Sequence, residues 1–140
     1  NYRMSNVLAA IGVGQMEVIE DRVNKKREIF EWYKKYLSDI EEITFMPELE
    51  EARGNRWLTA ITFEKTPYIK ILKALENINV ESRPLWKPMH MQPVFKDAKS
   101  IVDGTSEELF NKGLCLASST IMTEDDVKMI CDVIKGNLDG

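Results

Sequence analysis

Residues 57–63 read WLTAITF, a short run dominated by aromatic, β-branched and other hydrophobic side chains. Successive side chains of a β-strand point to opposite faces, so an alternating pattern places every second residue on one face. The run therefore predicts a strand with two distinct faces. We expect one face to carry Trp57, Thr59, Ile61 and Phe63, and the other to carry Leu58, Ala60 and Thr62.

A helical pattern precedes this strand. From position 6 to about Ser38, hydrophobic residues recur at spacings of three, four or seven, which predicts one long helix. Ser5 is its expected N-cap, and the charged segment 20–28 suggests a bend near Asp21. Small residues at positions 9, 10, 12 and 14 would allow another backbone to approach the helix closely.

Shorter elements surround the central strand. Segments 43–46, 80–84 and 114–117 are predicted strands, and residues 68–78 have helical spacing. Thr105-x-x-Glu108 and Thr123-x-x-Asp126 have the pattern of capping boxes that open two further helices. We therefore expect an α/β (α+β) fold, with a long N-terminal helix and a small, mostly antiparallel sheet covered on one side by helices.

Size and charge restrict the classes of function. The 140 residues fit one domain, and 19 basic against 23 acidic side chains give a formal net charge of −4. This balance argues against binding of nucleic acid, which needs a basic face. No apolar run is long enough to span a bilayer, so we expect no membrane partner. Cys115 and Cys131 have no neighbouring ligand pattern, and we expect buried, reduced thiols in a cytoplasmic protein.

Most catalytic patterns are missing. The single histidine excludes a histidine-rich metal set, and the glycines form no G-x-G-x-x-G phosphate-binding motif. The exception is segment 83–93, RPLWKPMHMQP, where prolines stiffen a backbone that carries cationic and aromatic side chains. Arg83, Trp86, Lys87 and His90 suit an anionic ligand that contains a ring. Alternatively, Trp86 and Leu85 fill the core while the charged groups are solvated.

The N-terminus has a similar composition. Asn1, Tyr2 and Arg3 supply an amide, a phenol and a guanidinium just before the first helix. They could face a partner or simply form a frayed terminus. Because the chain starts at Asn1 without an initiator methionine, we expect it to be a piece of a longer protein.

Three segments in order resemble one family. Residues 1–12 (NYRMSNVLAAIG) are similar to the start of the C-terminal region of DegT/DnrJ/StrS-type sugar aminotransferases. Residues 83–92 resemble a second signature, especially in the bacillosamine-type branch that makes UDP-linked amino-dideoxy sugars. Residues 113–127 resemble a third signature, usually Leu-Pro-Ser-Gly-Thr, in which Ala117 here replaces the proline and Ser119 the glycine.

The resemblance implies a fold-type-I, pyridoxal-phosphate-dependent homodimer, of which residues 1–140 are the small C-terminal domain. The large domain with the Schiff-base lysine would lie upstream, and neither Lys25 nor Lys112 is expected to replace that lysine. The parent enzyme would transfer an amino group from an amino acid, expected to be glutamate, to a 4-keto UDP-sugar for cell-surface polysaccharide or glycan synthesis. The 140 residues alone would be inactive.

The resemblance also implies roles for individual residues. Asn1 would contact the cofactor phosphate, and the expected substrate-binding residues are Tyr2, Arg3, Arg83, Trp86, Lys87 and His90. No metal site and no catalytic residue are expected in this chain. Two alternatives are a free-standing α/β module that binds a nucleotide-like anion and an interaction domain whose first helix is a dimer face.

Overall fold

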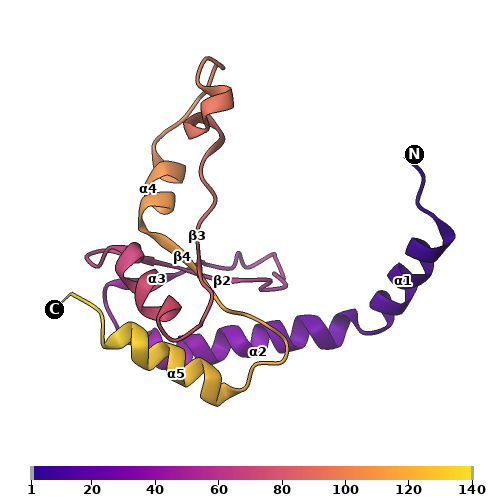
Figure 1. Ribbon diagram of the computed structural model, residues 1–140, viewed down its shortest axis with the longest axis horizontal. Coiled ribbons are helices and arrows are strands. Elements are labelled where there is room, and N and C mark those ends of the chain that lie inside the picture. The colour runs from indigo at the N-terminus through magenta and orange to yellow at the C-terminus, as the bar shows by residue number, and fades with distance from the viewer. Residues whose placement is uncertain (1, 140) are drawn as a thin grey trace.

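The computed structural model describes residues 2–139 and begins with two helices instead of one (Figure 1). α1 (Asn6–Glu17) and α2 (Ile19–Leu37) are separated by Val18, whose φ of −116° and ψ of 6° are not helical. The prediction of one helix is therefore wrong in detail, since the break falls at Val18 and not near Asp21. Ser5 is confirmed as the N-cap, because its hydroxyl accepts a hydrogen bond from the Leu8 N–H at 3.3 Å.

A four-stranded antiparallel sheet in the order β1-β2-β4-β3 confirms the predicted fold class. β1 (Ile43–Phe45) pairs with β2 (Thr59–Phe63), and β2 pairs with β4 (Gly113–Leu116). The edge strand β3 contains only Arg83–Pro84, much less than the expected 80–84. Prolines lack the N–H that extends a ladder, which helps to keep this edge short.

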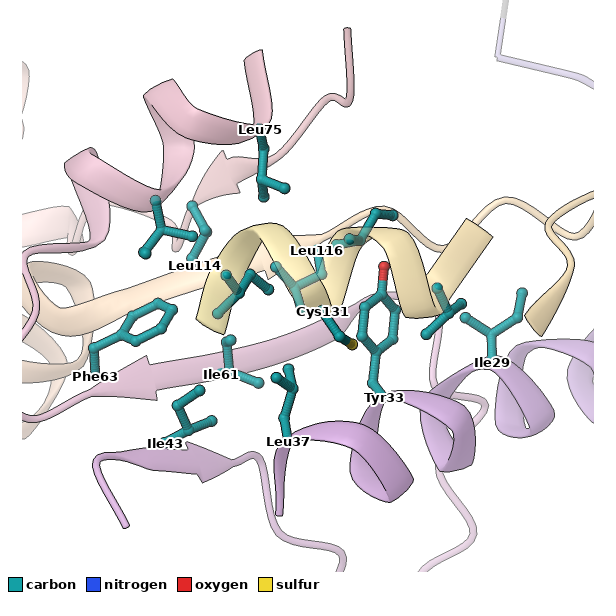
Figure 2. Packing of buried hydrophobic residues seen from close by; sticks show 14 of the residues in the cluster. Ile29, Tyr33, Leu37, Ile43, Ile61, Phe63, Leu75, Leu114, Leu116 and Cys131 are labelled. Atoms are coloured by element: carbon teal, nitrogen blue, oxygen red, sulfur yellow. The ribbon is translucent and has the colours of Figure 1, made fainter. Parts of the chain in front are cut away.

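Three helices cover one face of the sheet and enclose the core (Figures 1 and 2). α3 (Tyr68–Glu76) and α5 (Glu124–Lys135) pack with α2 against the side chains that β2 and β4 direct inward. Tyr33 from α2 lies beside Cys131 from α5, and its hydroxyl donates to the Ala117 carbonyl oxygen at 2.9 Å. The core includes Ile29, Tyr33, Leu37, Ile61, Phe63, Ile71, Leu75, Leu114, Leu116, Val127, Ile130, Cys131 and Ile134.

An arm extends from the body between β3 and β4 (Figure 1). It contains two short 3-10 turns, η1 (Met89–Met91) and η2 (Pro93–Phe95), followed by α4 (Thr105–Lys112). The predicted capping box at Thr105 is wrong, because α4 begins at Thr105 itself. Gly104, with φ +90°, is the N-cap, and the Asp103 carboxylate accepts from the Thr105 N–H at 3.0 Å.

The second predicted capping box is confirmed. Thr123 Oγ1 accepts from the Asp126 N–H at 3.3 Å, and Asp126 Oδ2 accepts from the Thr123 N–H at 2.8 Å. Cys115 and Cys131 are both free and buried, as expected. Within residues 2–139, no helix is both long and apolar enough to cross a membrane.

Candidate functional site

A cavity of about 980 Å³ lies beside the short strand β3 and the end of β4. Its walls come from the chain before and within the arm, from the end of β4 and the segment after it, and from α5. Lys26 of α2 and two residues of the turn before β2, Trp57 and Leu58, complete the lining. Because β3 pairs only with Leu114 and Cys115, the chain after Cys115 has no neighbouring strand on that side. The cavity adjoins this unpaired segment, and Leu116, Ala117, Ser118 and Ser119 line it.

Three of the residues expected at a ligand site line this cavity. Arg83, Trp86 and Lys87 are brought together there by the proline-rich segment that leaves β3. Trp86 is 66% exposed, so the alternative in which it fills the core is wrong. Leu85 takes the inward position, and its side chain packs closely against the backbone of Gly113.

The other expected site residues lie elsewhere. His90 does not line the cavity, and its Nε2 lies 4.0 Å from Glu107 Oε2 of α4 in the arm. Tyr2 and Arg3 are exposed before α1, which projects from the body without a buried residue (Figure 1). Asn1 lies outside the described residues. The single chain therefore assembles one group of the expected residues and leaves the other group apart from it.

Arg83 is held by a nearby carboxylate. Its Nε and Nη2 atoms donate to Glu81 Oε1 at 2.8 and 2.6 Å, while the side chain remains 74% exposed. Exposed ion pairs of this kind contribute little free energy, typically under about 1 kcal/mol. A bound anion could therefore compete with Glu81 for the guanidinium at small cost.

Trp57 also lines the cavity, which the sequence reasoning missed. The strand predicted over residues 57–63 starts two residues too early, because β2 begins at Thr59, and Trp57 before it is 62% exposed. The cause is the preceding turn, in which Arg56 has φ +50° and is buried in place of the tryptophan. The Arg56 guanidinium lies 4.0 Å from the centre of the Phe30 ring and donates to the Met46 carbonyl oxygen at 3.1 Å.

Lys26 is the second residue that sequence reasoning missed. It lines the cavity from α2, where its Nζ donates to the Trp57 carbonyl oxygen at 3.1 Å and to the Ser118 carbonyl oxygen. Burial lowers the pKa of this lysine below its ordinary value. No sequence signal separates Lys26 from the charged residues around it, since its role depends on two loops that come together only in the fold.

The charges of the cavity favour an anionic ligand. Its two acidic residues are already engaged, Glu81 with Arg83 and Asp126 with Thr123. Lys87, by contrast, has no carboxylate within ion-pair distance in the part of the chain that the structure describes. The arrangement suits binding and orientation of a substrate.

The described residues do not by themselves fit covalent attachment of pyridoxal phosphate. The cavity offers Lys26 and Lys87 as amines. Lys26 Nζ donates to two backbone carbonyl oxygens, and the Lys87 side chain is exposed to solvent. Covalent attachment at Lys26 would break both of these hydrogen bonds. These residues can form one wall of a substrate site.

Solved structures share this fold. PseC from Helicobacter pylori, an aminotransferase of pseudoaminic acid biosynthesis, superposes with a TM-score of 0.86 at 16% identity, covering 98% of this chain and 38% of that chain. A DegT DnrJ EryC1 StrS aminotransferase from Brucella abortus gives a TM-score of 0.82 at 23% identity, covering 96% of this chain and 36% of that chain. At these identities the similarity establishes the fold.

Sequence comparison establishes the family. The chain is 42% identical over 140 residues to EpsN of Bacillus subtilis (strain 168), named as a pyridoxal phosphate-dependent aminotransferase, covering 96% of this chain and 36% of EpsN. It is 33% identical over 142 residues to a GDP-perosamine synthase of Vibrio cholerae, covering 96% of this chain and 38% of that protein. The chain thus spans little more than a third of these relatives. A family model matches residues 1–135, and the chain belongs to the DegT/DnrJ/EryC1/StrS aminotransferase family.

Proposed function

We propose that residues 1–140 form the small C-terminal domain of a pyridoxal-phosphate-dependent sugar-nucleotide aminotransferase. The whole protein would transfer an amino group from an amino acid, expected to be glutamate, to a 4-keto sugar nucleotide for glycan biosynthesis. The observation that carries the proposal is that a chain of this family gathers Arg83, Trp86 and Lys87 around one cavity. These are three of the four residues that segment 83–93 nominates for substrate binding, the fourth being His90.

The cavity residues would bind the two parts of the ligand differently, the phosphates through charge and the ring through packing. The Arg83 guanidinium matches phosphate oxygens in a planar, bidentate geometry, and Lys87 adds an unpaired positive charge. Trp86 offers a flat apolar face to a ring. Together these groups would bind and orient the nucleotide part of the substrate, while the keto group would extend toward the rest of the protein.

A second copy of the chain would supply the residues that lie apart from the cavity. By family analogy, Asn1 would contact the cofactor phosphate of the other subunit, and Tyr2 and Arg3 would border the same site, with Arg3 facing the sugar nucleotide. His90, in the arm of the same chain as the cavity, would lie near the sugar or its diphosphate. In the single chain, Tyr2 and Arg3 are exposed before α1 and do not line the cavity, and α1 projects away from the body (Figure 1). A homodimer in which α1 of one chain reaches the site of the other would unite the two groups.

The cofactor would be held mainly by residues outside this chain. When bound, pyridoxal phosphate supplies the electron sink and carries the amino group. The lysine that binds it is proposed to lie in the remaining part of the longer protein, because the chain spans only 36% of EpsN. The role left to residues 2–139 is to bind the nucleotide and to exclude water from one side of the substrate.

The experiment is an amino-transfer assay on the longer protein and on the 140-residue chain, with glutamate and a 4-keto sugar linked to UDP or to GDP. We expect the longer protein to aminate the UDP-linked sugar preferentially, and the 140-residue chain to be inactive. Arg83→Ala should raise KM for the sugar nucleotide, whereas Lys73→Ala, on the exposed side of α3, should not. Amino transfer by the 140-residue chain, or none by the longer protein, would contradict the proposal.

A further inference from the structure

Two large aromatic side chains, both exposed to solvent, lie next to each other at the edge of the cavity. Trp57 and Trp86 are 62% and 66% exposed, although both could have been buried at a gain in free energy. They come from distant parts of the chain, the turn before β2 and the segment after β3, and both line the cavity. An exposed, contiguous apolar patch beside a cavity is typical of a binding site.

The geometry of the pair indicates how it could bind. The two ring centres are 6.0 Å apart and the ring planes are inclined by 38°. A flat ring inserted between them would need about 3.5 Å on each side, so it does not fit between the two tryptophans. A ligand ring would instead stack on their exposed faces, which together form a continuous aromatic surface.

Trp57 is held in this exposed position at a cost to the backbone. The residue before it, Arg56, has φ +50°, a conformation that residues other than glycine rarely adopt. The Trp57 N–H donates to Asn55 Oδ1 at 3.0 Å, and its carbonyl oxygen accepts from Lys26 at 3.1 Å. Strained backbone of this kind persists where the surrounding contacts impose it, commonly at functional sites.

Positive charge lies next to the aromatic surface. Lys87 directly follows Trp86 in the chain, and Arg83 lies on the same proline-rich segment. A ligand with a flat ring at one end and phosphate groups at the other would satisfy both features. A nucleoside diphosphate is the class of ligand with this chemistry.

We propose that Trp57 and Trp86 form an aromatic surface on which the base of a nucleoside diphosphate stacks, and that Lys26 is a positioning residue that holds Trp57 in place. The proposal rests on the proposed function, because it assigns the base of the same substrate. It adds two residues, Trp57 and Lys26, that no sequence motif nominates.

Tryptophan fluorescence of the 140-residue chain tests the proposal. The chain can be used alone because its buried hydrophobic core lies entirely within residues 29–134. A Trp32→Phe variant is the background, since Trp32 lies on α2 beneath Lys25 and does not line the cavity. UDP should quench the remaining fluorescence in a saturable manner. Trp57→Ala should weaken UDP binding about tenfold, as expected for loss of a stacked base, and Trp57→Phe should weaken it less.

Binding of inorganic pyrophosphate separates the contribution of the phosphates to affinity from that of the ring. Its affinity should be the same for Trp57→Ala and the background chain, because it has no ring to stack. Lys26→Met should weaken UDP binding about as much as Trp57→Ala, and Lys26→Arg should restore it. Circular dichroism would verify that each variant is folded, which is expected for Trp57 because its side chain is exposed.

Two results would overturn the proposal. One is the absence of UDP-dependent quenching, and the other is equal UDP affinity with and without the Trp57 side chain. If the longer protein still transfers amino groups in either case, only the aromatic site fails. If UDP binding depends on Trp57 but the longer protein does not transfer amino groups, the aromatic site stands and the proposed function fails.

Discussion

Substitution of Gly113 by alanine should destabilise the fold, although its backbone conformation suits any residue. With φ −103° and ψ 148°, Gly113 has ordinary extended geometry. A β-carbon there would nevertheless overlap Leu85 Cδ1 and would lie 2.6 Å from the Leu109 carbonyl oxygen. The Leu85 side chain could rotate away, but the Leu109 oxygen belongs to the backbone of α4 and can move only with the helix.

The expected magnitude follows from two opposing contributions. Replacing glycine by alanine reduces the entropy of the unfolded chain, which stabilises a protein by about 0.4–1 kcal/mol. Forcing an extra carbon into a packed site costs about 1–3 kcal/mol. The central values of these two ranges differ by about 1.3 kcal/mol, which is the net loss expected for Gly113→Ala. For a domain of 140 residues, this corresponds to a fall of about 4 °C in Tm.

Thermal unfolding followed by circular dichroism measures this loss. Gly136→Ala is the matched control, because a β-carbon there would meet its nearest atom at an ordinary 3.4 Å. Leu85→Ala combined with Gly113→Ala should cost less than the sum of the two single changes, since it removes one of the two clashes. A Gly113→Ala chain with a Tm equal to or above that of the original chain would refute the packing argument.

Three further predictions concern the core and the surface. Tyr33→Phe should lower the free energy of unfolding by about 1 kcal/mol, because the half-buried Ala117 carbonyl oxygen loses its hydrogen-bond donor, whereas Tyr36→Phe should cost less; urea titration measures both. The Arg27 hydrogen bond lowers the pKa of Glu48 from 4.5 to about 2. Glu48 should thus stabilise the fold above about pH 4.5 and lose this effect as the pH falls toward 2, so Glu48→Gln should flatten that part of an acid titration. Burial raises the pKa of Cys131 to about 12, and Ellman's reagent should label it only in step with unfolding.

Local sequence patterns predicted the presence of each helix or strand better than the residue at which it begins. The apolar spacing of α5 and the Thr123 capping box identified that helix, because both signals lie within one or two turns. The start of β2 was missed because the burial of Arg56 depends on Phe30 of α2 and on Met46, far away in sequence. The start of α4 had a readable signal in Asp103-Gly104, but the Thr105-x-x-Glu108 pattern suggested a different cap.

The same distinction applies to the site. Arg83, Trp86 and Lys87 could be nominated together because they lie within five consecutive positions of one proline-stiffened segment. Trp57 and Lys26 could not, because their place at the cavity requires the packing of α2 against the ends of β2 and β4. His90 was grouped with the cavity residues by sequence proximity, but the 3-10 turn at 89–91 carries it into the arm toward Glu107.

The two groups of proposed site residues depend on different parts of the molecule. Arg83, Trp86 and Lys87 are anchored by β3 and Leu85 to a closed core, so their exposed side chains can be changed without loss of the fold. Tyr2 and Arg3 precede α1, whose twelve residues include no buried one. An isolated helix of that length is marginally stable in water. The cavity can therefore be tested in the 140-residue chain, whereas Tyr2 and Arg3 can be tested only in the longer protein, where we expect another surface to cover α1.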